Sequence, residues 1–371
     1  MQTPAITSSW RRFDFWLLGA VVLLVIFGIT MIRSAIAGNI ELVELNLVQR
    51  QLIFAIIGFA IILLITAIDY RLWGSISRTL YIVTVVVLAV LFFVGAALFG
   101  SARWFDTGVI LIQPSELAKI VFIIMLADFF SRNIDRIQEI STIAKSLLIT
   151  AFMVVWILLQ PNLSTSIVMF VIWFSLLWAS GLRIKHLLVF FIAGIALPLA
   201  SFPFLVDYQK RRILNFLFFD PEARYGETYN IQQALISIGS GGWLGQGYGQ
   251  GPQVQHRFLK IRHSDFIFSA AAHEFGFIGI LLILLVLGFV IIRCLRAARL
   301  SADNFGALIC YGVATMIAFQ AIVNIGVNLN MMPATGLTLP FVSYGGSSLL
   351  STLVGIGLVE SVVVRHKSLE F

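Results

Sequence analysis

Long apolar stretches recur along this chain and limit its fold more than any other feature. Each is close to the roughly 20 mostly apolar residues that a membrane-spanning helix needs. Hydrophobic residues make up 59% of the 371 positions and charged residues only 12%, which is more apolar surface than one soluble core can bury. We therefore predict an all-α polytopic membrane protein, with one membrane domain over residues 1–371 and ten transmembrane helices. The helices are expected at 14–33, 50–69, 79–99, 109–130, 143–159, 163–181, 186–206, 266–293, 304–329 and 341–364.

The basic residues predict the orientation, because short cytoplasmic loops collect lysine and arginine. With the N-terminus inside, the short outer loops hold only Arg33, Arg50 and Arg103, and the long loop at about 207–265, between helices 7 and 8, is external. Both termini are then cytoplasmic, and the first apolar stretch is expected to be a retained helix and not a removed signal. The net charge of +7 suits an anionic inner leaflet and does not indicate nucleic acid.

The stretch "ILIQPSELAKI" places charged residues inside an expected membrane helix. Pro114 suits the first position of a helix, so Glu116 falls in the first turn and Lys119 follows on the same face. One interpretation is a buried Glu116–Lys119 ion pair that also complements the helix dipole. The other is a polar pocket below the outer surface that holds a phosphate or orients a substrate, because ionisable residues within a membrane usually mark a site.

Two further motifs allow a structural and a functional interpretation. The segment "LLQPNLSTS" predicts a tight external turn between two helices, with Ser164 and Thr165 available as caps. The segment "LPFVSYGGSSLL" contains small residues that let membrane helices pack closely. Its Ser343 and Tyr344 are also candidate hydrogen-bond donors in a cavity.

The long external loop begins with "DYQKRRILNFL", which alternates cations with apolar residues, as in a segment at the lipid interface. Lys210, Arg211 and Arg212 are either a solvated cluster or a grip on an anionic group, since arginine binds phosphate through two donors. The glycine-rich run "SIGSGGWLGQGYGQGPQ" follows. We expect it to be non-helical and to let the backbone approach a bulky ligand. It is a poor phosphate loop, because no Lys-Ser or Lys-Thr pair ends it.

The last candidate is "RHSD", directly before the eighth apolar stretch. Ser264 or Asp265 could cap the helix that follows. Capping alone does not require Arg262 and His263 beside them. An aspartate at the membrane surface, open to water and next to cations, could act as a general base for a hydroxyl group.

Taken together, these motifs resemble the SEDS family (shape, elongation, division and sporulation), typified by RodA and FtsW. The length and the "YQKRRILNFL" segment look more like RodA. The matching segments run in family order from end to end: "ARWFD" at 102–106, "QPSELAKI" at 113–120, "QPNLSTS" at 160–166, "YQKRRILNFL" at 208–217, "SIGSGGWLGQG" at 237–247, "RHSDFIFS" at 262–269 with "HEFGFIG" at 273–279, and "LPFVSYGGSS" at 339–348.

The resemblance implies a peptidoglycan glycosyltransferase of the bacterial inner membrane that polymerises lipid II, beside a class B penicillin-binding protein and other membrane proteins of the elongation or division complex. It also implies that Asp265 is the catalytic residue and that Glu116 and Lys119 support it. Asp265 would accept the proton of the acceptor sugar's 4-hydroxyl. The residues expected around the substrate are Arg103, Gln113, Ser115, Asn162, Lys210, Arg211, Arg212, Gly241, Gly242, Arg262, His263, Ser343 and Tyr344.

The sequence gives little indication of a cofactor. Cys294 and Cys310 offer neither metal spacing nor a disulfide framework. No cofactor is predicted with certainty. A divalent cation, Mg²⁺ or Mn²⁺, is the one candidate because diphosphate chemistry often recruits one, although no carboxylate cage for it is visible.

The chain departs from the family pattern at a few positions. The family usually has "QPDLGTS", where this chain has Asn162 and Ser164, and two glutamates where it has His273 and Glu274. Asparagine carries no charge and cannot act as a base, so Asn162 is not expected to take over a role that needs the acid of the family pattern. On a regular helix Asp265 and Glu274 face opposite sides, so Glu274 is expected to brace the bundle.

Two other functions fit a polytopic protein. A flippase or transporter of a lipid-linked oligosaccharide would use intramembrane charges such as Glu116, Lys119 and Glu360, but it should have paired inverted repeats and polar helices reaching both faces. An O-antigen ligase shares the large external loop. The serine- and glycine-rich motifs fit that class less well.

Overall fold

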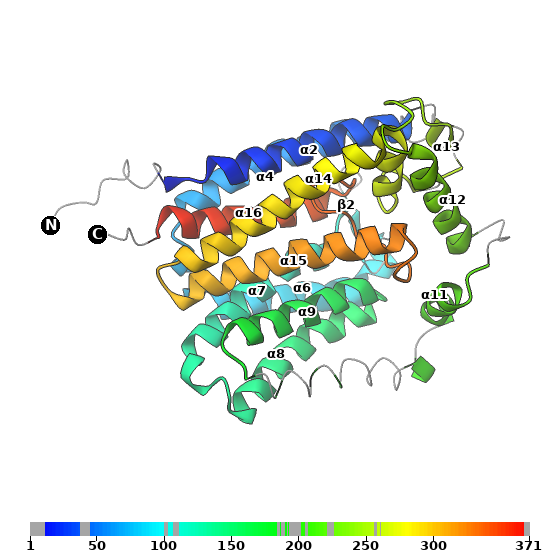
Figure 1. Cartoon of the computed structure of the whole chain (residues 1–371). Coiled ribbons are helices and arrows are strands. Elements are labelled where there is room, and N and C mark those ends of the chain that lie inside the picture. Colours follow the sequence, from blue (N-terminus) through cyan, green and yellow to red (C-terminus); the bar gives the residue numbers. More distant parts are fainter. Residues whose placement is uncertain are drawn as a thin grey trace.

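The computed structural model describes residues 12–37, 45–99, 103–106, 111–183, 186, 190, 192, 202–204, 207–220, 226–255, 258–259 and 261–366. These residues form a nearly all-helical bundle (Figure 1). Its long helices are α2 (Phe15–Ile36), α4 (Leu47–Ala67), α6 (Ser77–Phe99), α7 (Pro114–Arg132), α8 (Ile140–Leu159), α9 (Leu163–Ala179), α14 (Ile267–Leu300), α15 (Asn304–Asn328) and α16 (Gly346–Val364). The shorter elements are α5 (Tyr70–Ser75), α11 (Asp207–Leu217), α12 (Gly226–Gly241), α13 (Pro252–Gln255) and the antiparallel strands β1 (Phe105–Asp106) and β2 (Leu111–Ile112).

The bundle exposes apolar side chains on its outside, as a protein dissolved in lipid does. Among the described helices, seven are long and apolar enough to cross a membrane. Outer helices such as α6 and α8 expose large residues, including Phe93 at 70% and Ile140 at 81%. A water-soluble bundle would bury these residues. The chain is therefore an integral membrane protein, as the apolar stretches predicted.

Helices α7 and α16 lie in the middle of the bundle, and unlike the outer helices they bury polar residues. In the described part of the chain, α16 is 78% buried over its apolar window, and α7 buries Glu116, Lys119 and Asp128. Helix α16 packs closely on α4, where an added Cβ at Gly346 would lie 2.2 Å from the Phe54 ring. The predicted small-residue packing in "LPFVSYGGSSLL" is therefore present, and it brings the start of α16 against the start of α4.

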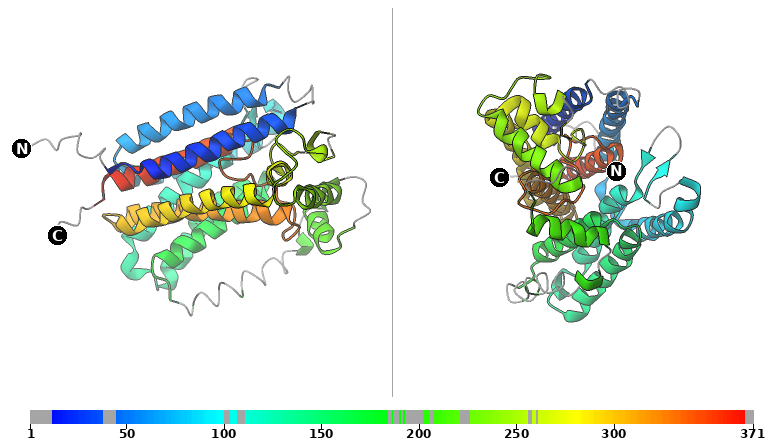
Figure 2. Two further views of the ribbon diagram at one scale, coloured as in Figure 1. Left: turned by 45° about the horizontal axis from the view of Figure 1, so that its top comes forward. Right: turned by 90° about the vertical axis from the view of Figure 1, so that its right-hand side faces the viewer.

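The two ends of the bundle differ. The first and last described residues meet at one end, where the Arg12 guanidinium donates to the carbonyl of His366 at 2.8 Å. The opposite end carries α11, α12 and α13, so the long loop and the chain ends lie on opposite sides (Figure 1). Viewed from the α11–α13 end, the strands β1 and β2 lie at the rim of the bundle (Figure 2). We call these the terminal end and the loop end.

Nine of the predicted spans each coincide with a described helix. The largest shifts at a start are in two helices: α7 begins at Pro114 and not at 109, as the proline at its first position favours, and α16 begins at Gly346 and not at 341. The remaining span, 186–206, lies almost wholly outside the described residues, so the count of ten stays a prediction.

Helix α14 is longer than predicted and is not regular. It runs over 34 residues and contains Gly276 with φ 66° and ψ −169°, a conformation open almost only to glycine. At this point an added Cβ would lie 2.3 Å from the backbone nitrogen of Gly245. The kink therefore lets the segment after α12 dock against α14, close to the loop end.

Candidate functional site

A cavity of ≈ 630 Å³ opens at the loop end of the bundle. The first turns of α4, α7, α9 and α16 meet around it, together with the segments before α14 and α16. Helix N-termini present unpaired N–H groups and a partial positive charge. The residues that line the cavity are Asn46, Gln49, Arg50, Ile53, Phe54, Trp104, Gln113, Glu116, Asn162, Ser164, Thr165, His263, Ser264, Asp265, Gly336, Leu337, Thr338, Tyr344, Gly345, Gly346, Ser347 and Ser348.

Asp265 reaches this cavity because it does not cap α14. The helix begins after Phe266, and no side chain at that N-cap position bonds the first turn. Instead, the Asn328 side chain on α15 accepts from the Ser269 backbone N–H at 3.1 Å and from its hydroxyl at 2.6 Å. The capping interpretation of Ser264 and Asp265 is therefore wrong, since a neighbouring helix supplies the acceptor.

Two amides of α15 also hold the backbone at Asp265. The carbonyl oxygen of Asp265 accepts from Asn324 Nδ2 at 3.1 Å and from Asn328 Nδ2 at 3.0 Å. Asn324 Nδ2 donates to Leu337 O at 2.8 Å as well, which ties the segment before α16 to the same point. These two asparagines are four residues apart and lie on one face of α15. Sequence reasoning missed both, although two buried amides at this spacing in an apolar helix were a visible signal.

The surroundings of Asp265 favour a basic carboxylate. Burial raises the pKa of Asp265 above its ordinary value, while a hydrogen bond with Ser264 and the positive charge of Arg212 oppose this shift. A Cβ added at Gly336 would lie 3.8 Å from Asp265 Oδ2, so the wall beside the carboxylate is bare backbone. A carboxylate with a raised pKa accepts a proton more readily, and a cavity gives it room for a ligand.

Glu116 and Lys119 form the predicted pair. Lys119 Nζ donates to Glu116 Oε2 at 2.8 Å, and the lysine is 1% exposed. Glu116 lines the cavity, whereas Lys119 lies behind it. The Ser351 hydroxyl donates to the Glu116 carbonyl at 2.7 Å, which links α16 to α7. The ion pair and the polar pocket are thus both present, since Lys119 balances a carboxylate that faces the cavity.

Arg50 is the cation that the sequence interpretation overlooked. Its position in a short outer loop entered only the orientation argument, yet it lies in the first turn of α4 and lines the cavity. Burial raises the pKa of Tyr344, and the charge of Arg50 and a hydrogen bond with it oppose that shift. Among the described lining residues it is the only arginine or lysine. The tight packing of α16 on α4 brings it there, which no local pattern reveals.

Asn162 caps α9 and faces the cavity. Its Oδ1 accepts from the Thr165 N–H at 3.2 Å, and its Nδ2 donates to Ser115 Oγ at 3.4 Å. The cap is therefore Asn162, not the predicted Ser164 or Thr165. An aspartate could make the same cap, so the departure from the family pattern keeps the turn and removes a charge. Gln113, the N-cap of α7, donates its N–H to Ser347 Oγ at 2.9 Å.

His263 and Tyr344 line the cavity next to Asp265, and Ser343 lies behind them. The rings of His263 and Tyr344 lie edge to face with centroids 5.8 Å apart. Burial lowers the pKa of His263, and the positive charge of Arg262 adds to this, which favours the neutral imidazole. Ser343 donates to the Ser264 carbonyl at 2.7 Å and does not line the cavity. It fixes the segment that carries Asp265.

The other predicted cations lie off the cavity wall. Arg103 donates to the carbonyls of Gln160, at 2.8 Å, and Pro161, at 2.5 Å, and so holds the turn before Asn162. Arg262 is 3% exposed and donates to the carbonyl oxygens of Ala35 and Leu259.

The basic residues of α11 stand at the loop end, outside the cavity wall. Arg212 Nη1 donates to the carbonyl of Thr335, next to Gly336, at 3.4 Å. Arg211 is exposed and Lys210 is half-buried on the same helix. Of the three, Arg212 acts on the site through its charge near Asp265.

The glycine-rich run differs from its prediction. Helix α12 continues through Gly241, so the expectation of a non-helical run was wrong at its start. A Cβ added at Gly241 would lie 2.1 Å from the carbonyl oxygen of Ala272, and Gly242 (φ 55°) accepts from the Phe277 N–H at 2.8 Å. The glycines therefore let α12 pack against α14. The glycines were expected to let the backbone approach a ligand. At Gly241 and Gly242 the backbone approaches α14.

His273 and Glu274 stand where the family pattern has two glutamates, and both connect α14 to neighbouring helices. His273 Nδ1 lies 2.8 Å from Ser240 Oγ on α12. The Ser34 hydroxyl on α2 donates to Glu274. Both side chains are buried and connect α14 to its neighbours. This agrees with the predicted bracing role of Glu274.

A helical membrane bundle that directs the first turns of four helices, an arginine and two carboxylates into one cavity defines a polytopic membrane protein with a polar, charged cavity at one end. Comparison with known proteins gives its family. The model of the FtsW/RodA/SpoVE family, described as cell cycle protein, matches residues 15–368, and the chain belongs to this family. The SEDS resemblance is thereby confirmed.

Relatives cover the chain from end to end. It is 33% identical over 365 residues to the probable peptidoglycan glycosyltransferase FtsW of Geobacter metallireducens, with 96% of each chain covered. A solved structure on the coordination of polymerization and crosslinking by a peptidoglycan synthase complex matches with a TM-score of 0.80 and 32% identity, over 95% of this chain and 97% of that one. The crystal structure of RodA from Thermus thermophilus matches with a TM-score of 0.72 and 29% identity, over 97% and 99%. Similar identities to FtsW and RodA leave the closer likeness to RodA a prediction.

Proposed function

We propose that this chain is a peptidoglycan glycosyltransferase that polymerises lipid II, the undecaprenyl-diphosphate-linked disaccharide peptide. Its family membership and the names of its relatives support this activity. The observation that carries the proposal is the Asp265 carboxylate, which burial makes more basic and which faces a ≈ 630 Å³ cavity at the loop end. A lipid-linked substrate reaches such a site with its sugars outside the hydrocarbon and its anchor within it.

Asp265 acts as general base in this proposal. The 4-hydroxyl oxygen of the acceptor sugar attacks the anomeric carbon of the donor, and its proton passes to the Asp265 carboxylate. The bond from that carbon to the diphosphate oxygen breaks, and undecaprenyl diphosphate leaves with the bonding electrons. Attack from the face opposite the leaving group turns an α-linked donor into a β-linked product. Asn324 and Asn328 set the position of the carboxylate through the Asp265 carbonyl.

The leaving diphosphate needs positive charge nearby as its own negative charge grows. Arg50 and the first turns of α4, α7, α9 and α16 supply it on the cavity wall. Glu116, balanced by Lys119, and the amide of Asn162 offer hydrogen-bonding groups for the sugars. Arg103 and Arg262 act by holding backbone segments. Lys210 and Arg211 on α11 remain candidates for contact with the substrate as it arrives.

A divalent cation does not fit this site as a resident group. Among the described residues, no three His, Cys, Asp or Glu side chains come together to hold a metal ion. The two carboxylates on the cavity wall are Asp265 and Glu116, and Lys119 already pairs with the second. A cation that arrives bound to the diphosphate stays a prediction, and the steps above do not use it.

The proposal includes orientation and partners. The terminal end faces the cytoplasm and the loop end faces the outside of the bacterial inner membrane, as the distribution of basic residues predicts. A class B penicillin-binding protein would crosslink the product, within an elongation or division complex. Likeness to a peptidoglycan synthase complex supports this partner.

Purified protein supplied with lipid II tests the proposal, with glycan chains followed on a gel. We expect polymer from the wild type and from Asp135→Ala, an exposed aspartate at the terminal end, and none from Asp265→Ala. If Asp265→Ala polymerises as well as the wild type, the catalytic assignment is wrong. If no variant makes polymer with a partner transpeptidase present while labelled lipid II crosses vesicles, the chain is a flippase.

A further inference from the structure

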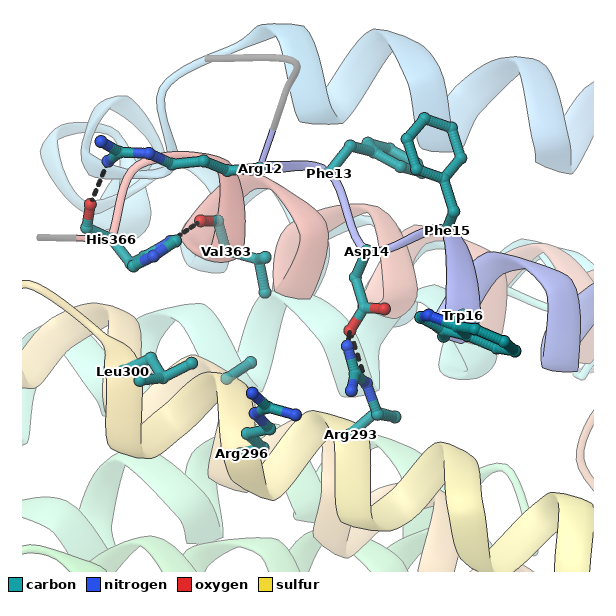
Figure 3. Close-up of a pocket in the computed structure, with 11 residues that line it drawn as sticks. Arg12, Phe13, Asp14, Phe15, Trp16, Arg293, Arg296, Leu300, Val363 and His366 are labelled. Atoms are coloured by element: carbon teal, nitrogen blue, oxygen red, sulfur yellow. Dashed lines mark hydrogen bonds and ion pairs between the residues drawn. The ribbon is translucent and has the colours of Figure 1, made fainter. Parts of the chain in front are cut away.

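A second cavity, of ≈ 350 Å³, lies at the terminal end of the bundle. The start of α2, the last turns of α14 and the end of α16 surround it (Figure 3). The proposed reaction does not use it. Its lining residues are Arg12, Phe13, Asp14, Phe15, Trp16, Arg293, Arg296, Ala297, Leu300, Val363 and His366.

The single lining carboxylate is already occupied. Asp14 Oδ2 accepts from Arg293 Nε at 2.7 Å, and Asp14 Oδ1 accepts from the Leu17 N–H at 3.0 Å, which caps α2. The Asp14 N–H donates to the buried Glu360 at 3.0 Å, so the aspartate is fixed from both sides. Asp14 is also 8% exposed. It therefore cannot turn to neutralise the other cations on the cavity wall.

Two arginines remain for a ligand. Arg296 is exposed and makes no hydrogen bond or ion pair with any residue that the structure describes. Arg12 uses one terminal nitrogen to hold the His366 carbonyl and keeps its other donors. With Arg293 balanced by Asp14, the cavity carries an excess of two positive charges. Its wall selects an anion with several acceptor oxygens, such as a phosphate.

The rim of the cavity points to the membrane surface as the source of this anion. Trp16 is 76% exposed and Phe15 is 70% exposed at the start of α2, beside the cavity. Leu300 adds a further exposed apolar side chain at the end of α14. Tryptophan and other aromatics gather at the membrane–water interface, where their rings sit at headgroup level. A soluble anion would gain nothing from these side chains, whereas a lipid packs its acyl chains against them.

We propose that the terminal-end cavity binds the phosphate of an anionic phospholipid from the adjacent leaflet, which the proposed orientation makes the cytoplasmic one. Arg296 and Arg12 hold the phosphate, and Trp16 and Phe15 border the glycerol and upper acyl region. The volume lies within the range of about 300–1,000 Å³ typical of small-ligand sites. Because α2, α14 and α16 all contribute, the bound lipid stabilises the bundle at this end.

Native mass spectrometry and thermal unfolding of the full-length protein in neutral detergent test this site. Phosphatidylglycerol is titrated against phosphatidylcholine, and glycerol phosphate is the soluble arm. We expect phosphatidylglycerol alone to stay bound and to raise the Tm. Arg296→Gln should weaken that binding about fivefold, the effect of one basic residue near an anionic surface. Arg299→Gln removes the same charge one turn along α14, outside the cavity lining, and should retain the binding.

Each other outcome overturns the proposal. Equal weakening by Arg296→Gln and Arg299→Gln would mean diffuse attraction and no site. Equal binding of phosphatidylcholine would remove the anion selectivity. Equal stabilisation by glycerol phosphate would remove the role of the lipid. Because the readouts are binding and Tm, failure of this proposal is separate from failure of the proposed glycosyltransferase activity, which is measured as polymer.

Discussion

Replacing Asn328 by leucine should slow the proposed reaction, although Asn328 does not line the cavity. The Asn328 side chain makes four hydrogen bonds: it accepts from the Ser269 N–H and hydroxyl, and it donates to the carbonyls of Asp265 and Asn324. Leucine has nearly the same size, so packing is kept while every one of these bonds is lost. The variant therefore isolates how the start of α14 and the backbone at Asp265 are held.

The magnitude follows from the groups left behind. The Ser269 residue is 0% exposed, and a buried N–H that loses its acceptor costs about 1–3 kcal/mol. The Asp265 carbonyl keeps its bond from Asn324 at 3.1 Å, so the loss of its second donor costs about 0.5–1.5 kcal/mol. The sum is about 1.5–4.5 kcal/mol of folding stability. A shift of the carboxylate by about 1 Å would slow the reaction on the order of 100-fold.

Thermal unfolding and the initial rate of lipid II polymerisation measure the two effects, and Gln320 provides the matched control. Gln320 is a buried amide two turns earlier on the same face of α15, and its Nε2 has no hydrogen-bond partner among the described residues. Gln320→Leu should be neutral or stabilising, with an unchanged rate. The reasoning fails if Asn328→Leu keeps the wild-type rate, or if Gln320→Leu slows the reaction as much.

Four further outcomes follow from the structure. Arg50→Gln should lower kcat on the order of 100-fold, as loss of one transition-state donor does, whereas Arg33→Gln, an exposed arginine at the same end, should not; equal rates would remove Arg50 from the site. Polymerisation should fall as pH falls through the raised pKa of Asp265, because the carboxylate is the working form. Arg212→Gln should move that acidic limb to higher pH in a pH–rate profile, since its charge lowers this pKa; a shift to lower pH would contradict the assignment. Gly276→Ala should lower the Tm, with about 1–3 kcal/mol of backbone strain alone, and an unchanged Tm would contradict the close approach to the segment after α12.

The apolar pattern was sufficient to predict the nine long helices that the structure describes. Membrane helices satisfy their own backbone hydrogen bonds, so their existence depends on local composition. The Pro114 start and the Glu116–Lys119 pair were predictable for the same reason, because residues three apart on one helix are neighbours. The kink at Gly276 was not, because it depends on contact with a segment some thirty residues earlier in the chain.

The site was only partly predictable, since it is assembled from contacts between helices. The motif at Asp265 indicated a base, but the acceptor that frees it from capping is Asn328, on another helix. The sequence placed Arg50 in a short outer loop. It lies at the cavity only because α16 packs on α4, which is a contact between distant parts of the chain. Arg262 is three residues before Asp265 and was expected near the substrate. Its side chain instead donates to the backbone carbonyls of Ala35 and Leu259.

The most direct test is the single-turnover rate of lipid II polymerisation by Asp265→Asn, with lipid II binding measured on the same sample. Asparagine keeps the shape of the side chain and cannot take the proton. We predict retained binding and a rate at least about 100-fold lower, the low end of a general-base contribution. A wild-type rate from Asp265→Asn would show that another group removes the proton.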